Sequence, residues 1–278
     1  MENNNAKTLL AAAASLGEIR YPIPGTRGEG AFIIVPEGYD VHDLEHLMPA
    51  PNRKRANVVT ADAASFVCYI KKHGSLDDCT IYADVDSEKS ICILIAIIND
   101  HGEDKPQWRD HQCRFEPKQS VEWKRWISKN RAVMNQSDFA TWLEDNLSDV
   151  ALVAGMPTGA DILTMALGFE ANAEKRLRSK INLQNGGVQF EFIEDETKET
   201  RTSMKVFERF TLGLPVFDGS SNAYPLEARL KYRDREGKVS FWYELIRPDR
   251  VFKAAVADGL QQIKDSTGFP ILFGEPGK

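Results

Sequence analysis

Histidine, cysteine and acidic residues gather in one short stretch of the sequence, from Asp100 to Cys113. His111 and Cys113 are two positions apart, so a strand would place both side chains on the same face. Together with His101 from the preceding turn, they would offer nitrogen and sulfur ligands to a metal ion. The spacing matches no known zinc module, and a polar turn beside one strand histidine is the more common structure. The sequence therefore offers His101, His111 and Cys113 as a metal site against that simpler alternative.

Two other patterns suggest chemistry but lack its context. His42 and His46 stand one helical turn apart, yet the residues between them lack the glutamate arrangement of a metalloprotease. Residues 25–30 read GTRGEG, which offers a phosphate-binding loop or, as the simpler alternative, a flexible loop. The sequence contains no G-x-S-x-G nucleophile motif and no Walker loop. We therefore expect no cofactor and favour a protein that is not an enzyme.

Cationic and aromatic residues alternate in a helix predicted after Pro117. Such a helix can hold phosphates while its rings stack on bases. The candidate nucleic-acid-binding residues are Trp123, Lys124, Arg125, Trp126, Lys129 and Arg131. Both tryptophans, however, share a helical face with Ile127, which is the spacing of a core stripe backed by a solvated cationic face. The pattern leaves both interpretations open and favours the core stripe.

The composition is that of an ordinary soluble globular protein. The 278 residues are 42% hydrophobic and 27% charged, which suits one large domain or two modest ones. A formal net charge of −6 gives the whole chain no attraction to nucleic acid or anionic membranes, although local basic patches could still act. The longest apolar run, Ile91 to Ile98, is far shorter than the roughly 20 residues that span a bilayer. We expect that run to be a buried strand, and we expect no membrane partner.

The N-terminal residues and the cysteines indicate the cytoplasm. The chain begins without a basic segment, and the side chains of Leu9 to Ala14 are too small for the apolar core of a signal peptide. The four cysteines lie in the first half of the chain without CxxC spacing. This arrangement is typical of reduced thiols rather than of a disulfide framework.

The first half of the chain predicts an N-terminal segment and a small α+β domain. Residues 1–59 contain an Ala-rich helix from Asn5 to Leu16, followed by irregular backbone that prolines and glycines break, and we interpret them as a docking segment. Residues 60–154 begin with a helix capped by Thr60. Three strands are predicted next, at Thr80–Val85, Ile91–Ile98 and His111–Phe115. Two helices follow them, one after Pro117 and one with its cap at Ser137.

Residues 155–278 predict an antiparallel sheet packed by a terminal helix. Apolar and polar side chains alternate along several segments, which is the pattern of a half-buried sheet. The apolar positions are Val188, Phe190, Phe192, Ala228, Leu230, Tyr232, Val239, Phe241, Tyr243 and Leu245. Asn185 to Gly187 is a hairpin signal, because glycine allows the positive φ of a tight turn. With a helix from Asp249 to Thr267 closing the chain, the expected fold class is α+β.

Four stretches of the sequence resemble one known family. They read DFATWLEDN at residues 138–146, FTLGLPVFDG at 210–219, YPLEARLKYR at 224–233 and SFWYELIRP at 240–248. Together they resemble the YfdQ-like proteins of phages and prophages, a family of unknown function. The resemblance implies a phage-encoded protein of the host cytoplasm, often found among early or recombination-associated genes. It carries over no catalytic residues.

These observations lead to one favoured function and two alternatives. The lack of a catalytic constellation, the long C-terminal sheet and the turn aromatics Phe217 and Tyr224 favour a non-enzymatic protein. Such a protein would self-assemble into a homo-oligomer, bind host or phage proteins, or do both. The first alternative is a nucleic-acid-binding accessory factor in phage recombination, acting through the tryptophan-rich helix. The weaker alternative is a metal- or nucleotide-dependent enzyme that uses the His101 to Cys113 hairpin.

Overall fold

The computed structural model describes residues 7, 19–20, 32–33, 47, 49–51, 53–171, 176–182, 187–193, 201–235 and 238–277. The chain divides into two compact units, Met1–Lys54 and Arg55–Lys278. In the first unit, β1 (Ile19–Arg20) pairs antiparallel with β2 (Phe32–Ile33). Of the helix predicted at residues 5–16 only Lys7 is described, and residues 25–30, His42 and His46 lie outside the described residues.

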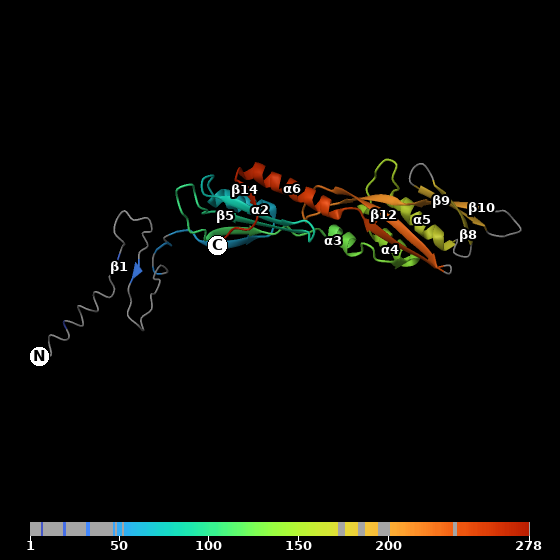
Figure 1. Cartoon of the computed structure of the whole chain (residues 1–278), viewed down its shortest axis with the longest axis horizontal. Helices are drawn as coiled ribbons and strands as arrows, with labels where there is room; N and C mark the ends of the chain where they lie inside the picture. The colour runs from blue at the N-terminus through green and yellow to red at the C-terminus, as the bar shows by residue number, and fades with distance from the viewer. Residues whose placement is uncertain are drawn as a thin grey trace. The chain divides into compact units, whose positions relative to one another are not determined.

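A five-stranded mixed sheet belongs to the second unit (Figure 1), with the strand order β14-β4-β5-β6-β3. The bounds are β3 Ala56–Thr60, β4 Thr80–Asp86, β5 Ile91–Ile97, β6 His111–Phe115 and β14 Ile271–Phe273. The three central strands pair antiparallel, whereas β3 pairs parallel with β6 and β14 pairs parallel with β4. The three strands predicted here are confirmed, and β3 and β14 extend the sheet at its two edges.

Two helices, α2 (Ala63–His73) and α6 (Pro248–Thr267), lie on one face of this sheet (Figure 1). The ring of Phe66 on α2 packs on that of Phe115 on β6, with centroids 5.7 Å apart. The predicted cap of α2 at Thr60 is wrong, because Thr60 ends β3 in register with Phe115. Asp62 caps the helix instead, where its carboxylate accepts a 2.7 Å hydrogen bond from the amide of Ser65.

A four-stranded antiparallel sheet has the order β11-β12-β13-β7. Its bounds are β7 Met134–Asn135, β11 Arg209–Leu214, β12 Tyr224–Arg235 and β13 Lys238–Leu245. The alternation predicted for β12 and β13 is confirmed, since Ala228, Leu230, Phe241 and Tyr243 are all buried. The opposite side chains of β12, which are mostly charged, are exposed.

Two helices pack on the buried face of the four-stranded sheet. In α3 (Val121–Ser128), Trp126 contacts Tyr243 with ring centroids 5.0 Å apart, and in α4 (Gln136–Asp145), Phe139 stacks on Phe241 at 5.0 Å. The predicted cap of α4 at Ser137 is wrong, because the Asn135 side chain accepts the hydrogen bond from the amide of Asp138. A 3₁₀ turn, η2 (Leu147–Asp149), and helix α5 (Gly159–Ala171) follow.

A third sheet is antiparallel, with the order β10-β9-β8. Its strands are β8 Arg176–Asn182, β9 Gly187–Ile193 and β10 Arg201–Phe207. The pairing of β8 with β9 agrees with the predicted hairpin, although residues 183–186 of the turn lie outside the described residues. Helices and largely antiparallel sheets together confirm the α+β class.

One buried apolar cluster extends from Phe66 on α2 to Phe269 after α6 and includes side chains of the five- and four-stranded sheets. The predicted division between residues 60–154 and 155–278 falls inside the unit Arg55–Lys278 and stays a prediction. In the part of the chain that the structure describes, no helix combines the length and apolar character needed to cross a membrane.

Candidate functional site

A groove of about 1010 Å³ lies between α2 and α6, above the covered face of the five-stranded sheet. Its apolar lining includes Val67, Leu94, Phe115, Val256, Leu260 and Ile263. Concave apolar sites of this size are where proteins most often bind ligands. The groove is therefore the first candidate for a binding site.

Polar groups stand at the rim of the groove. The hydroxyl of Tyr224 donates a 2.9 Å hydrogen bond to the carboxylate of Asp258 on α6. Burial, together with that bond, raises the pKa of Tyr224. Lys71 and Lys118 also line the groove and form no ion pair with any described residue. The turn aromatics Tyr224 and Phe217 are both half-buried, and Phe217 packs edge-to-face on Phe252.

Gly259 keeps part of the groove open. It lies inside α6, where glycine disfavours a helix by about 1 kcal/mol relative to alanine. A Cβ atom at this position would meet nothing within 4 Å, so packing among the described residues does not require a glycine here. Across the groove, Cys68 of α2 presents an exposed thiol.

The predicted metal ligands do not form a ligand set. His111 and Cys113 are both buried on one face of β6, as their spacing predicted. His111 Nε2 is 2.9 Å from the hydroxyl of Tyr69, whereas the exposed His101 accepts a hydrogen bond at Nδ1 from the amide of Gln107. Among the described residues, no three His, Cys, Asp or Glu side chains are placed to hold a metal ion together.

The same hairpin contains an ion pair that sequence reasoning missed. Arg109 Nε lies 2.9 Å from Asp100 Oδ1, and the hydroxyl of Tyr82 donates to Asp100 Oδ2 at 3.0 Å. Both side chains of the ion pair are largely buried, and burial together with Asp100 raises the pKa of Tyr82. Arg109 Nη1 also donates to the carbonyl of Gly277 at 2.8 Å. The pair therefore fastens the C-terminal residues to the hairpin.

Helix α3, which the sequence offered as a nucleic-acid-binding element, has both of its tryptophan rings in the protein core. Trp123 and Trp126 are 1% and 0% exposed, and Trp126 Nε1 donates to the carboxylate of Asp149 at 2.7 Å. Arg125 donates to the side-chain oxygen of Asn146 at 2.6 Å. The rings cannot stack on bases from this position. Of the six predicted nucleic-acid-binding residues, Lys124, Lys129 and Arg131 are exposed.

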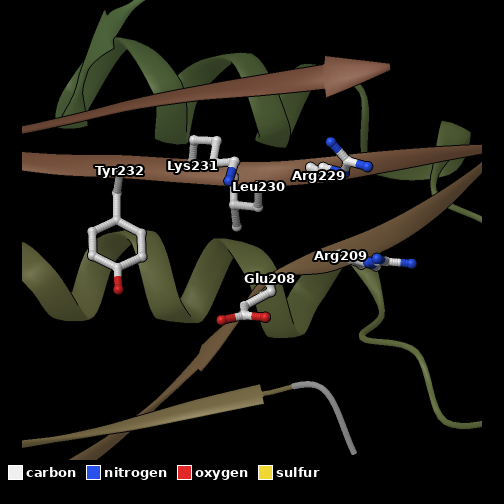
Figure 2. A pocket seen from close by; sticks show the side chains of 6 residues that line it. All are labelled: Glu208, Arg209, Arg229, Leu230, Lys231 and Tyr232. Carbon is white, nitrogen blue, oxygen red and sulfur yellow. The ribbon is translucent and has the colours of Figure 1, made fainter. Parts of the chain in front are cut away.

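A second, smaller hollow of about 400 Å³ lies beside β11 and β12 (Figure 2). Its lining residues are Glu208, Arg209, Arg229, Leu230, Lys231 and Tyr232. Burial, and then the nearby charge of Glu208, raises the pKa of Tyr232 to about 12. Arg209 and Arg229 are direct cross-strand partners. Sequence reasoning did not identify this site, although the alternating cations of the stretch RLKYR at residues 229–233 were visible in the sequence.

The fold and these sites define an α+β protein with an apolar interhelical groove and a cationic sheet face. The chain belongs to the family described as "Uncharacterized conserved protein (DUF2303)", whose model matches residues 4–276. Comparison with curated proteins found no match, and comparison with solved structures found none.

Proposed function

We propose that this protein is a non-enzymatic phage protein that assembles with copies of itself in the host cytoplasm and binds host or phage components there. The phage assignment rests on the resemblance of its motifs to the YfdQ-like proteins. The observation that supports self-assembly is the face of the five-stranded sheet opposite α2 and α6, which is partly exposed among the described residues.

Part of that face presents apolar side chains to solvent, although Ile97 at the far end of β5 is 0% exposed. Register places Leu272, Tyr82, Ile95, Arg114 and Val59 in one row across the five strands. Val59 and Leu272, on the two edge strands, are 73% and 50% exposed, and Ile91 on the same face of β5 is 37% exposed. Exposed apolar surface on the strands of a soluble protein marks an interaction site.

A second copy of the chain fits this face by charge. Asp84 on β4 is the cross-strand partner of Ile93, and Arg114 on β6 is the partner of Ile95. The acidic and basic side chains therefore flank the isoleucines on opposite sides. A two-fold axis along β5 would place β6 of one copy opposite β4 of the other, so that Arg114 and Asp84 come to the same side of an apolar centre, two residues apart along the strands. Arg114 also pairs with Glu116 of its own strand end at 3.4 Å.

Light scattering coupled to size exclusion tests this proposal on the untagged protein. We expect a discrete oligomer whose absorbance ratio at 260 and 280 nm is that of protein. We also expect Ile93→Lys to dissociate it, because a desolvated charge at the centre of an interface is costly. Val121→Lys is the matched control, since Val121 is 63% exposed on α3. A wild-type protein that stays monomeric across micromolar concentrations would contradict self-assembly.

The two alternatives from the sequence stay proposals with their own tests. An accessory factor in phage recombination must bind single strands at low ionic strength. A metal-dependent enzyme must retain its metal, so elemental analysis of protein never exposed to a nickel column tests the metal-dependent hypothesis. A metal content near zero would remove it.

A further inference from the structure

We infer that the outer face of the four-stranded sheet binds single-stranded nucleic acid. This surface, called the cationic face below, is defined by Arg209, Arg229, Lys231, Arg233 and Trp242. Its four cations are exposed and its tryptophan is half-buried. The proposal is independent of self-assembly, because the cationic face lies on a different sheet from the isoleucines.

The strand geometry spaces the cations along a line. Arg229, Lys231 and Arg233 occupy alternate positions of β12, so all three project from the side opposite the buried Leu230. A strand advances about 3.4 Å per residue. The three cations therefore stand about 6.8 Å apart in a straight row, which can follow the backbone of an extended single strand.

The pairing of β11 with β12 places two arginines side by side. Arg209 and Arg229 stand directly opposite each other, and like charges in that position destabilise a sheet. Two acids relieve the repulsion in part: Glu227 lies 3.8 Å from Arg209, and Glu244 is the partner of Arg229 on β13. Both side chains of the Arg209–Glu227 pair are about half exposed, so the pair contributes little to stability. A phosphate bound here would remove the remaining repulsion.

The hollow beside these arginines gives an anion room to approach them. It takes in Arg209, Arg229 and Lys231, and Figure 2 shows the two arginine head groups close to one another at the same end of the hollow. Tyr232 lies at its other end, and Glu208 and Lys231 lie in between (Figure 2). A phosphate is therefore expected at the end that the two arginines form.

Trp242 supplies the aromatic surface that the buried tryptophans of α3 do not. It is the cross-strand partner of Lys231, and the Arg233 guanidinium carbon lies 5.5 Å from the centroid of its ring. A guanidinium over one ring limits its motion by a cation–π contact. Base stacking on aromatic side chains stabilises single-strand complexes by about 1–3 kcal/mol per base. Cations in a row beside one ring therefore favour an unpaired strand over a duplex, whose bases are not free to stack.

The test is fluorescence anisotropy with a labelled oligothymidylate of twenty nucleotides, titrated with full-length protein over a range of salt. The cationic-face variant is Arg229→Gln with Lys231→Gln and Arg233→Gln. The matched control is Lys124→Gln with Lys129→Gln and Arg131→Gln, which removes three exposed cations from the segment that the sequence favoured. Circular dichroism and thermal unfolding establish that each variant is folded.

We expect salt-dependent binding by the wild-type protein and a loss of about tenfold or more in affinity for the cationic-face variant. The slope of log K against log salt should become shallower by about 2, because each phosphate contact on a single strand contributes about 0.7. Trp242→Leu should weaken binding and leave that slope unchanged. The α3 control should bind like the wild type.

Four results would overturn the inference. These are no binding by the wild type at low salt, full affinity in the cationic-face variant, an equal loss in the α3 control, and equal or tighter binding of a duplex of the same length. Because the readout uses binding alone, a monomeric protein that still binds oligothymidylate would contradict self-assembly and leave the cationic face supported.

Discussion

The hydroxyl of Tyr243 on β13 donates a 2.8 Å hydrogen bond to the main-chain carbonyl of Trp126 in α3. Both side chains are 0% exposed, and their ring centroids are 5.0 Å apart. The bond occupies a carbonyl in the last turn of a short helix, where intrahelical partners run out. It therefore joins the helix to the sheet at a place that water does not reach.

Replacing Tyr243 by phenylalanine keeps the ring and removes that bond. We expect the free energy of unfolding to fall by about 1–3 kcal/mol, because the buried carbonyl of Trp126 loses its partner. Urea unfolding followed by tryptophan fluorescence measures the change. Tyr224→Phe is the control, since its partner Asp258 is exposed, and it should cost less. Equal effects in the two variants would contradict the assignment.

Alkaline pH should destabilise the protein through the buried Tyr243 and the half-buried Tyr232. Burial raises the pKa of Tyr243, and burial followed by Glu208 raises the pKa of Tyr232 to about 12. Their stabilising effect is complete below the unfolded pKa of about 10 and is lost as pH rises from there through the folded values. Unfolding midpoints between pH 8 and 11 should therefore fall above about pH 10. Tyr243→Phe should flatten that fall, and an unchanged profile in this variant would argue against the prediction.

Thiol reactivity should separate one cysteine from the other three. Burial raises the pKa of Cys79 to about 12 and the pKa values of Cys92 and Cys113 to about 11, so these thiols stay protonated and covered. Cys68 is exposed. We expect one rapid equivalent with Ellman's reagent at pH 8, because the thiolate is the reactive form. Cys68→Ser should abolish the rapid phase. A second rapid equivalent would show that a buried thiol opens to solvent.

Arg109→Met should loosen the C-terminal residues as well as the hairpin. It leaves the largely buried Asp100 without its cation, a change that typically costs about 3–5 kcal/mol in a buried pair, with somewhat less expected here. Amide exchange should accelerate in β14, which Gly277 adjoins. Arg247→Met is the matched control, because Arg247 pairs with Asp249 at the surface, and it should leave that exchange unchanged. Unaltered exchange in Arg109→Met would contradict the fastening role.

Local sequence patterns could predict the antiparallel strands but not the sheet edges. An apolar run marks β5, whereas β6 follows a polar turn signal and alternates buried with half-buried side chains. Each pairs with a strand that is its neighbour in the chain. The first residues of β3 fall in the segment predicted to be irregular, since they follow Pro51 and a basic run, and the described partner of β3, β6, is far along the chain. β14 has only three residues and also pairs parallel with a remote strand. Parallel pairing leaves no turn signal in the sequence.

The candidate site was less predictable, because the same spacing of aromatic residues along a helix is found in core helices and in binding surfaces. The period that placed Trp123 and Trp126 on one helical face is the same for a core stripe and for a stacking surface, and only packing against the sheet decides between them. Conversely, Arg229, Lys231 and Arg233 looked like the ordinary solvated side of a half-buried strand. Their significance depends on Arg209 and Trp242, which pairing places beside them.

The position of β14 has a consequence for synthesis on the ribosome. Its partner β4 is made early, whereas β14 follows α6, so one edge of β4 has no strand to pair with until almost the whole described chain has been translated. Helix α6, which forms one wall of the groove, is translated just as late. The nascent protein therefore carries an open β edge and uncovered apolar surface through most of translation, a state prone to aggregation. Demand for a chaperone should accordingly peak before release and fall once α6 and β14 dock.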